Sequence, residues 1–124
     1  MNGKYLIDTN AVIALLGNNK SLANVLSSAN WIGISVITEL EFLSFSNLSK
    51  TDKTLFENFK KRIEIISLDT NDTTLIQLIC DVRQMHRLKL PDAIIASTAL
   101  NNQATLLTND AMFRKVTGLS VQTF

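Results

Sequence analysis

The chain has 124 residues, of which 46% are hydrophobic and 19% are charged, with four glycines and one proline. This composition excludes a disordered or fibrous protein and predicts one compact domain over residues 1–124. Twelve lysine and arginine residues against eleven acidic residues give a net charge of +1, so any nucleic-acid binding must come from a local basic patch.

The sequence predicts a protein without a membrane span or a signal peptide. No apolar run approaches the roughly 18 residues that span a bilayer, and the first residues lack a signal-peptide pattern. The one cysteine, Cys80, cannot form an intrachain disulfide, which suits a reducing compartment, and its apolar helical surroundings predict a core position. We therefore expect a cytoplasmic protein.

The first half of the chain predicts two strands and three helices. The apolar run that ends at Asp8 is typical of a buried parallel strand. A turn signal at Gly17 ends the first helix, an i, i+3, i+4 and i+7 apolar spacing predicts the second, and Ser35 is a good N-cap for the third. In chain order these elements occupy residues 5–7, 11–16, 21–29, 31–34 and 36–45.

The second half alternates helices and strands in the same way. Its first helix has a basic outer face, and the second has a core stripe of Leu75, Ile79, Val82 and either Met85 or His86. The third opens at Leu90-Pro91-Asp92, since proline is favoured at the first helical position. The first two elements occupy residues 50–62 and 63–68, and the long helix starts at the cap candidates and first-turn acids of residues 69–72 and runs to about residue 87. The last three occupy residues 90–100, 104–107 and 119–121. This alternation predicts an α/β fold, a three-layer α/β/α sandwich around a mainly parallel sheet of four or five strands.

Two of the acidic residues follow predicted strands. Asp8 and Asp110 each close an apolar strand and precede a helix, where an aspartate is also a common N-cap. In an open parallel sheet the carboxyl ends of the strands lie along one edge, which is where such sheets bind ligands. We therefore expect these two carboxylates to lie near each other.

Two further acids are candidates for the same edge. Asp92 follows Pro91, and the small residues Ala93, Ala96 and Ala99 allow its helix to approach the sheet closely. Glu39 is one position too late to form a capping box with Ser35, whereas Glu41 has the capping spacing from Thr38. Glu41 can thus be explained as a capping or surface residue, and Glu39 is left as the functional candidate.

Gathering four carboxylates is unfavourable unless a cation binds them. At an effective dielectric near 20, two charges about 5 Å apart repel by roughly 3 kcal/mol. Mg²⁺ or Mn²⁺ matches a set of oxygen ligands, whereas zinc is disfavoured by the single cysteine and the single histidine. We predict that Asp8, Glu39, Asp92 and Asp110 hold a divalent metal.

These residues stand in a familiar order. The chain resembles the PIN-domain ribonucleases and, among them, the VapC-type toxins of toxin–antitoxin pairs. The resemblance rests on four blocks, each weakly specific alone but strong as an ordered set: residues 6–10, 35–40, 90–96, and 107–110 with Phe113. It implies that Asp8, Glu39, Asp92 and Asp110 are the acidic quartet, with Thr9 and Thr108 as polar support.

The resemblance also implies an activity and partners. It implies a single-strand-selective endoribonuclease that requires Mg²⁺ or Mn²⁺, leaves 5′-phosphate and 3′-hydroxyl ends, is usually dimeric, and is silenced by a small antitoxin inserted into the active site. Chemically, carboxylate-bound metal can activate a water for attack on phosphorus, with no nucleophilic side chain. Arg83, Arg87 and Lys89 precede Asp92 and are candidate contacts to the RNA backbone.

Other functions remain open at this point. An aspartyl-phosphate phosphatase would have a second aspartate where this chain has Asn10, and a receiver domain needs a lysine after a late strand that the chain lacks. A non-enzymatic protein-binding module has no reason to keep four acids. A housekeeping PIN nuclease differs from a toxin only in its biological partner.

Overall fold

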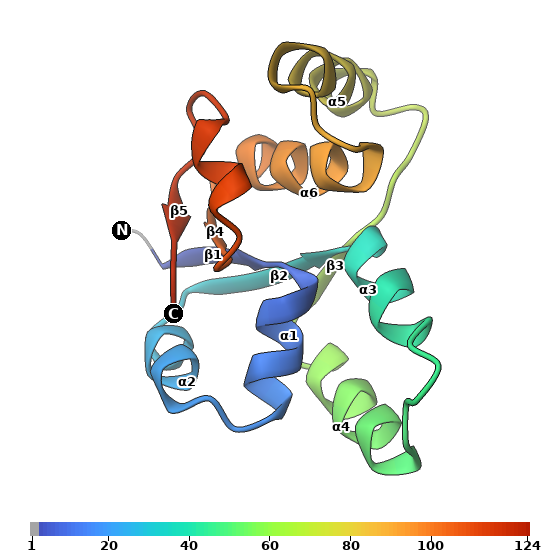
Figure 1. Ribbon diagram of the computed structural model, residues 1–124, viewed down its shortest axis with the longest axis vertical. Coiled ribbons are helices and arrows are strands. Elements are labelled where there is room, and N and C mark those ends of the chain that lie inside the picture. Colours follow the sequence, from blue (N-terminus) through green and yellow to red (C-terminus); the bar gives the residue numbers. More distant parts are fainter. Residues whose placement is uncertain (1–2) are drawn as a thin grey trace.

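The structure, a computed structural model, describes residues 3–124. The first two residues, part of the N-terminal stretch expected to lack a signal peptide, lie outside the described residues. Within them the chain forms one five-stranded sheet of spatial order β3-β2-β1-β4-β5, in which every pair of neighbouring strands is parallel (Figure 1). The strands are β1 (Lys4–Ile7), β2 (Trp31–Ser35), β3 (Glu64–Ile66), β4 (Thr105–Leu107) and β5 (Val121–Gln122).

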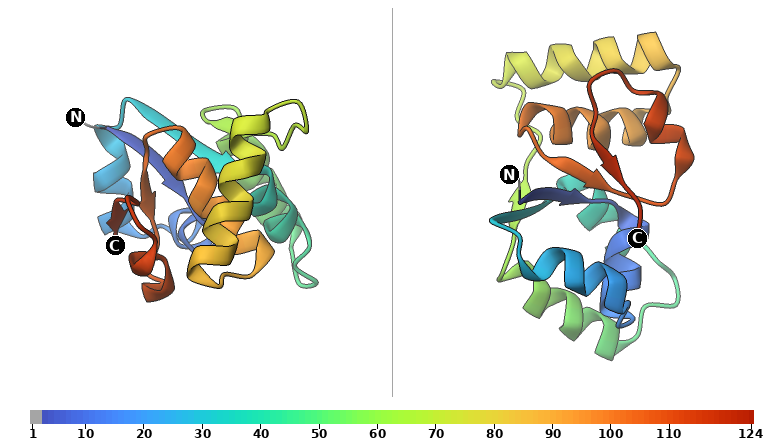
Figure 2. Two further views of the ribbon diagram at one scale, coloured as in Figure 1. Left: turned by 90° about the horizontal axis from the view of Figure 1, so that it is seen from above. Right: turned by 90° about the vertical axis from the view of Figure 1, so that its left-hand side faces the viewer.

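Helices cover both faces of the sheet. Figure 2 shows three layers, with α5 and α6 on one side of the strands and α1, α2 and α4 on the other. Helix α3 packs beside the sheet against α1 and α6. The predicted three-layer α/β/α sandwich is therefore confirmed. The helices are α1 (Thr9–Leu16), α2 (Lys20–Ser27), α3 (Val36–Leu43), α4 (Lys50–Lys60), α5 (Thr73–His86), α6 (Leu90–Asn101) and the 3₁₀ helix η1 (Ala111–Lys115).

The carboxyl-terminal half of strand β1, Leu6 and Ile7, is apolar because both of its faces are covered. Leu6 packs into the core beneath α5 and α6, together with Leu106 of β4. Ile7 points the other way, into the core formed with α1, α2 and α4, together with Leu107. Successive residues of a strand face opposite sides, so the part of a strand that is covered by two helical layers is apolar at successive positions. This burial holds the carboxyl ends of β1 and β4 firmly in place.

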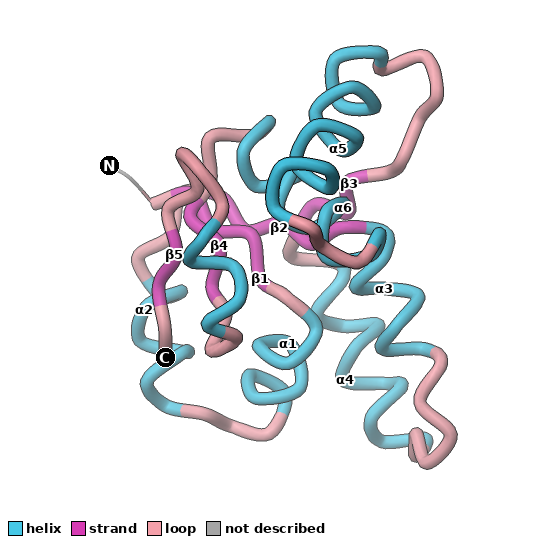
Figure 3. Tube along the Cα trace, turned by 45° about the horizontal axis from the view of Figure 1, so that its top comes forward, coloured by secondary structure: helices cyan, strands magenta, loops and turns pink. Residues whose placement is uncertain are grey.

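The predicted helix over residues 36–45 ends earlier, at Leu43. The hydroxyl of Ser44 donates a hydrogen bond of 2.6 Å to the carbonyl oxygen of Leu40 at this end of the helix. A loop follows (pink in Figure 3), and α4 begins after a capping box between Ser49 and Asp52. Phe45 therefore lies in this loop rather than in a helix.

The core position predicted for Cys80 on α5 is wrong. Leu75, Ile79 and Val82 are buried as predicted, but Cys80 is exposed. It follows Ile79 by one residue, which turns its side chain by about 100° from the buried stripe. At the end of the stripe His86 is half-buried while Met85 is exposed.

Among residues 3–124, no helix has the length and apolar character needed to cross a membrane.

Candidate active site

The order in which the chain adds strands to the sheet changes sides between β1 and β4. From β1 the chain builds β2 and β3 on one side and later returns to add β4 and β5 on the other. Ile7 and Leu107 are partners in the register of these two strands, so Asp8 and Thr108 follow them side by side. A crevice outside the carboxyl ends of strands at such a point is the usual ligand site of an open α/β sheet.

Asp8 is both a helix cap and a buried acid. One carboxylate oxygen, Oδ1, accepts a hydrogen bond of 2.8 Å from the backbone N–H of Ala11 in the first turn of α1, and Oδ2 accepts from the hydroxyl of Thr108. The residue is only 5% exposed. Burial raises the pKa of Asp8 above its ordinary value, the two hydrogen bonds oppose this, and the charges of Asp110 and Glu41 raise it further.

Thr108 connects Asp8 to Asp110. Its buried hydroxyl oxygen donates to Asp8 and accepts a hydrogen bond of 3.0 Å from the backbone N–H of Asp110. Asp110 in turn caps η1, because its Oδ1 accepts a hydrogen bond of 3.0 Å from the backbone N–H of Met112. Both strand-end aspartates are thus caps and neighbours of one pocket at the same time.

We expect Thr108→Val to destabilise the protein by about 1 to 3 kcal/mol, because the buried carboxylate of Asp8 loses a hydrogen-bond donor while side-chain volume is kept. Thr108 lowers the pKa of Asp8, so the loss should be larger at neutral pH than in acid. Urea unfolding at two pH values measures both effects. Thr105→Val is the matched control, since its half-buried hydroxyl meets only Ser120 at 3.3 Å. Equal losses from the two variants would contradict this role of Thr108.

Asp92 lies in the first turn of α6, a helix that is buried from Ala93 to Ala99. The helix begins at Leu90, and Lys89 occupies the N-cap without a side-chain capping bond. Burial raises the pKa of Asp92, and the negative charges of Asp110 and Glu41 raise it further, while Lys89 lowers it. Asp92 is therefore an acid placed in a negatively charged environment.

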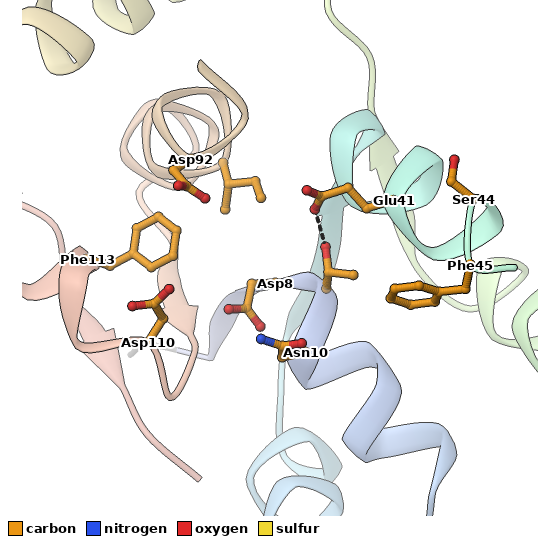
Figure 4. A pocket seen from close by; sticks show the side chains of 10 residues that line it. Asp8, Asn10, Glu41, Ser44, Phe45, Asp92, Asp110 and Phe113 are labelled. Atoms are coloured by element: carbon orange, nitrogen blue, oxygen red, sulfur yellow. Dashed lines mark hydrogen bonds between the residues drawn. The ribbon is translucent and has the colours of Figure 1, made fainter. Parts of the chain in front are cut away.

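The three aspartates line one open pocket of about 450 Å³ (Figure 4). The carboxylates of Asp92 and Asp110 lie on one wall, and Asp8 lies between them and helix α1. Residues from β1 to η1, distant in the sequence, thus meet at the carboxyl edge of the sheet. The full lining consists of Asp8, Thr9, Asn10, Glu41, Ser44, Phe45, Asp92, Ile95, Asp110 and Phe113.

The structure does not bring Glu39 to this pocket. The carboxylate of Glu39 pairs with the ammonium group of Lys60 on α4 at 3.1 Å, and the same ammonium group pairs with Glu57 at 2.9 Å. The fourth acid in the pocket is Glu41, whose carboxylate accepts a hydrogen bond from the hydroxyl of Thr9 (Figure 4). The predicted placement of Glu39 is wrong, because Glu39 has the structural role of joining α3 to α4.

The donor set of the pocket fits a hard divalent cation. Its ionisable groups are all carboxylates, and burial, with a further contribution from the neighbouring negative charges, raises the pKa values of Asp8 and Asp92. Cys80 is exposed on α5 and His86 accepts a hydrogen bond from the backbone N–H of Thr117, so neither lines the pocket. Within residues 3–124 no three acidic, histidine or cysteine side chains are close enough to share an ion as they stand. Binding an ion therefore requires the carboxylates to draw together.

The predicted RNA contacts lie outside the pocket lining. Arg83, Arg87 and Lys89 are exposed at the end of α5 and in the turn before α6. Arg87 ends α5 in the left-handed conformation, with φ of 54°. Lys89 is near enough to lower the pKa of Asp92. This turn therefore places cations beside the acidic pocket.

The chain matches the family described as PIN domain over residues 5–119. The chain belongs to the PIN-domain family. PIN domains are nucleases, and this membership supports hydrolysis of nucleic acid rather than aspartyl-phosphate chemistry. We found no match among curated proteins.

Solved structures of similar fold include toxin–antitoxin complexes. A toxin–antitoxin complex from Klebsiella pneumoniae contains a chain that is 27% identical, with a TM-score of 0.78 and 96% of each chain covered. VapBC2 from Rickettsia felis, bound to a DNA fragment from its promoter, contains a chain that is 24% identical, with a TM-score of 0.81 and coverage of 96% of this chain and 97% of that one. VapBC-1 from nontypeable Haemophilus influenzae contains a chain that is 22% identical, with a TM-score of 0.78 and 96% of each chain covered.

Proposed function

We propose that this PIN domain, acting as one nuclease unit over residues 1–124, is an Mg²⁺- or Mn²⁺-dependent endoribonuclease that cleaves single-stranded RNA, and that it is the toxin of a VapC-type toxin–antitoxin pair. One observation carries the proposal: Asp8, Glu41, Asp92 and Asp110 come from separate elements to one pocket at the carboxyl edge of the sheet. We propose these four as the catalytic and metal-binding residues, with Glu41 in place of Glu39.

The pocket favours attack by water rather than by a side chain. The hydroxyl of Thr9 donates to Glu41 and that of Ser44 donates to a backbone carbonyl oxygen, so each is already hydrogen-bonded. No histidine, lysine or cysteine lines the pocket to activate either hydroxyl. A bound divalent cation would supply the missing chemistry, by neutralising the phosphate and lowering the pKa of a water.

The acids differ in how firmly hydrogen bonds hold their carboxylates. Asp8 is held by Ala11 and Thr108 and has little freedom to turn. Within residues 3–124 no hydrogen bond affects the pKa of Asp92, whose carboxylate is therefore available as a ligand. Glu41 is held toward the pocket by Thr9. A site with fixed and adjustable ligands of this kind is suited to a cation that keeps several waters.

We propose that the turn before α6 binds the RNA backbone. Arg83, Arg87 and Lys89 are exposed, and among residues 3–124 the ion pairs found involve only Lys60. Their charges are thus available to phosphate groups. Since the net charge of the chain is only +1, this local patch has to counter the repulsion between RNA and the acidic pocket.

A small antitoxin and a second copy of the chain are the proposed protein partners. An apolar groove lined by residues such as Ile13, Leu16 and Phe42 lies beside the acidic pocket and could hold an antitoxin segment that reaches into it. Leu40 and Leu43 of α3, 55% and 43% exposed, are available to a homodimer interface. We propose a cytoplasmic location, where RNA and antitoxin are both at hand.

Purified protein should cleave single-stranded RNA only with Mg²⁺ or Mn²⁺, because the acids cannot bind phosphate without a cation. The measurement is mapping of cleavage ends on total RNA, with EDTA and the Asp92→Asn variant as controls. Products should carry 5′-phosphates. Metal-independent cleavage, or equal cleavage by Asp92→Asn, would exclude this mechanism.

The partner proposal has its own test. Expression of the protein alone should arrest growth, and co-expression of a short neighbouring reading frame should restore it. Active protein that is harmless when expressed would instead favour a housekeeping nuclease.

A further inference from the structure

Phe45 is an exposed aromatic residue in the wall of the acidic pocket. Its side chain belongs to the loop after α3, is 43% exposed, and lines the same pocket as the four acids. The other aromatic residue in that lining, Phe113, is only 2% exposed. Neither the acid chemistry nor the core explains why a large apolar ring is left in solvent at this place.

The ring is held by the core beneath it. Phe45 makes an edge-on contact with Phe42, with ring centroids 6.0 Å apart and planes at 70°. Phe42 is buried and stacks on the buried ring of Phe56 of α4, with centroids 4.3 Å apart. Because this row of rings fixes Phe45 in advance, a ligand that contacts it loses little side-chain entropy on binding.

The surroundings of Phe45 are those of a nucleotide rather than of an apolar ligand. Figure 4 shows Phe45 on the α3 side of the pocket, with Asp92 and Asp110 on the opposite side and Glu41 and Asn10 between. A planar group stacked on the ring would have hydrogen-bonding side chains at its edges and the proposed phosphate site beyond them. A nucleobase has this combination of an apolar face and polar edges.

We propose that Phe45 stacks on an unpaired nucleobase next to the scissile phosphate and so makes the enzyme selective for single strands. The inference rests on the proposed ribonuclease function. Bases inside a duplex have both faces covered by their neighbours, and only a splayed base can meet an aromatic side chain. Stacking on an aromatic ring accepts any base, so Phe45 selects strandedness rather than sequence.

Phe45 also lines the neighbouring apolar groove, so a protein segment is the competing occupant. The pocket that the ring lines also contains carboxylates and the amide of Asn10, which suit the edges of a base better than an apolar side chain. The two occupants make different demands on the ring: a base needs a flat aromatic face, whereas a packed side chain needs only apolar volume.

The test compares Phe45→Leu and Phe45→Trp in the cleavage-deficient Asp92→Asn background with Mg²⁺ present. Binding of a single-stranded oligoribonucleotide is followed by fluorescence of 2-aminopurine placed in turn at each position around the mapped cleavage site. At one position the fluorescence should show stacking in the proteins that carry Phe45 or Phe45→Trp, but not in the protein that carries Phe45→Leu. The Phe45→Leu substitution should also weaken binding of the RNA about tenfold. An oligoribonucleotide that lacks the base at that position should bind the protein with Phe45 about tenfold more weakly than the intact RNA does. The same RNA should bind Phe45→Leu no more weakly than the intact RNA does.

The controls separate this inference from the function on which it rests. Leu55→Ala, at a residue 41% exposed on α4 and outside both pockets, should bind RNA normally, and melting curves should show that Phe45→Leu is folded. Wild-type cleavage without any dependence on the base or on Phe45 would overturn the stacking inference alone. Normal RNA binding with weakened antitoxin binding in Phe45→Leu would assign the ring to the protein partner. Absence of RNA cleavage by the wild type would overturn both proposals.

Discussion

Glu41→Gln should lower the rate of single-stranded RNA cleavage by about a hundredfold or more, whereas Glu39→Gln should leave it within about twofold. The two residues are separated by one position on α3, and only Glu41 lines the pocket with the three aspartates. Loss of its charge removes a proposed metal ligand. Loss of the charge of Glu39 removes only its pair with Lys60.

Single-turnover rates at saturating Mg²⁺ and at limiting Mg²⁺ measure this difference. The Glu41 variant should also need more metal for half-maximal rate, and Glu39→Gln should not. Glu39→Gln serves as the matched control for the loss of one carboxylate from the same helix, and its partly exposed ion pair contributes up to about 1 kcal/mol of stability. A folded Glu39→Gln variant without activity would reverse the assignment of the two residues.

Asp92→Asn should abolish cleavage and at the same time raise the melting temperature of the metal-free protein. Asp92 carries a pKa raised by burial and by the charges of Asp110 and Glu41, so its ionised form destabilises the folded state. The amide removes that charge with almost no change in shape. Its effect on activity follows because an amide is a poorer ligand for Mg²⁺ and leaves the cation less neutralised.

The sign of the pH dependence follows from the direction of the shift. Because the folded-state pKa lies above the unfolded value of about 4, the folded protein binds more protons between these two values, and stability is lost as pH rises through that window. The advantage of Asp92→Asn should therefore be full near pH 7 and disappear below about pH 4. Thermal melting from pH 3 to 8 with EDTA measures it.

Adding metal should make the melting temperature of the wild type higher than that of the Asp92→Asn protein. Mg²⁺ or Mn²⁺ should raise the melting temperature of the wild type, since a ligand that binds only the folded state stabilises it. The Asp92→Asn protein should respond much less. A wild-type melting temperature unchanged by excess metal, or cleavage retained by Asp92→Asn, would remove Asp92 from the proposed site.

The sequence allowed the sheet and three of the pocket acids to be anticipated for physical reasons. An apolar strand covered on both faces has an unbroken apolar pattern, and parallel strands end along one edge, so Asp8 and Asp110 had to be neighbours. The small residues of α6 likewise indicated a helix close to the sheet. Burial and the order of strands in the sheet leave a direct trace in the pattern of apolar and polar residues.

The choice between Glu39 and Glu41 could not be made in the same way. Thr38 and Phe42 form the buried side of α3, and at 100° per residue the two glutamates flank that side to the left and right. Which flank faces the pocket depends on how α3 lies against α1 and α6, and α4 supplies Lys60 to the other flank. That is tertiary information. Phe45 was missed for a related reason, because the early end of α3 places it in a loop.

The four acids differ in what supports them. Asp8 and Asp110 are joined through Thr108 at the ends of buried strands, and Asp92 belongs to a buried helix. Glu41 is carried by α3, which α4 braces through Lys60 and Glu39. If an ion draws the acids together, its affinity and the docking of α3 on α4 are thermodynamically linked. Substitutions on α4, far from any ligand atom, can then tune how tightly the nuclease holds its metal.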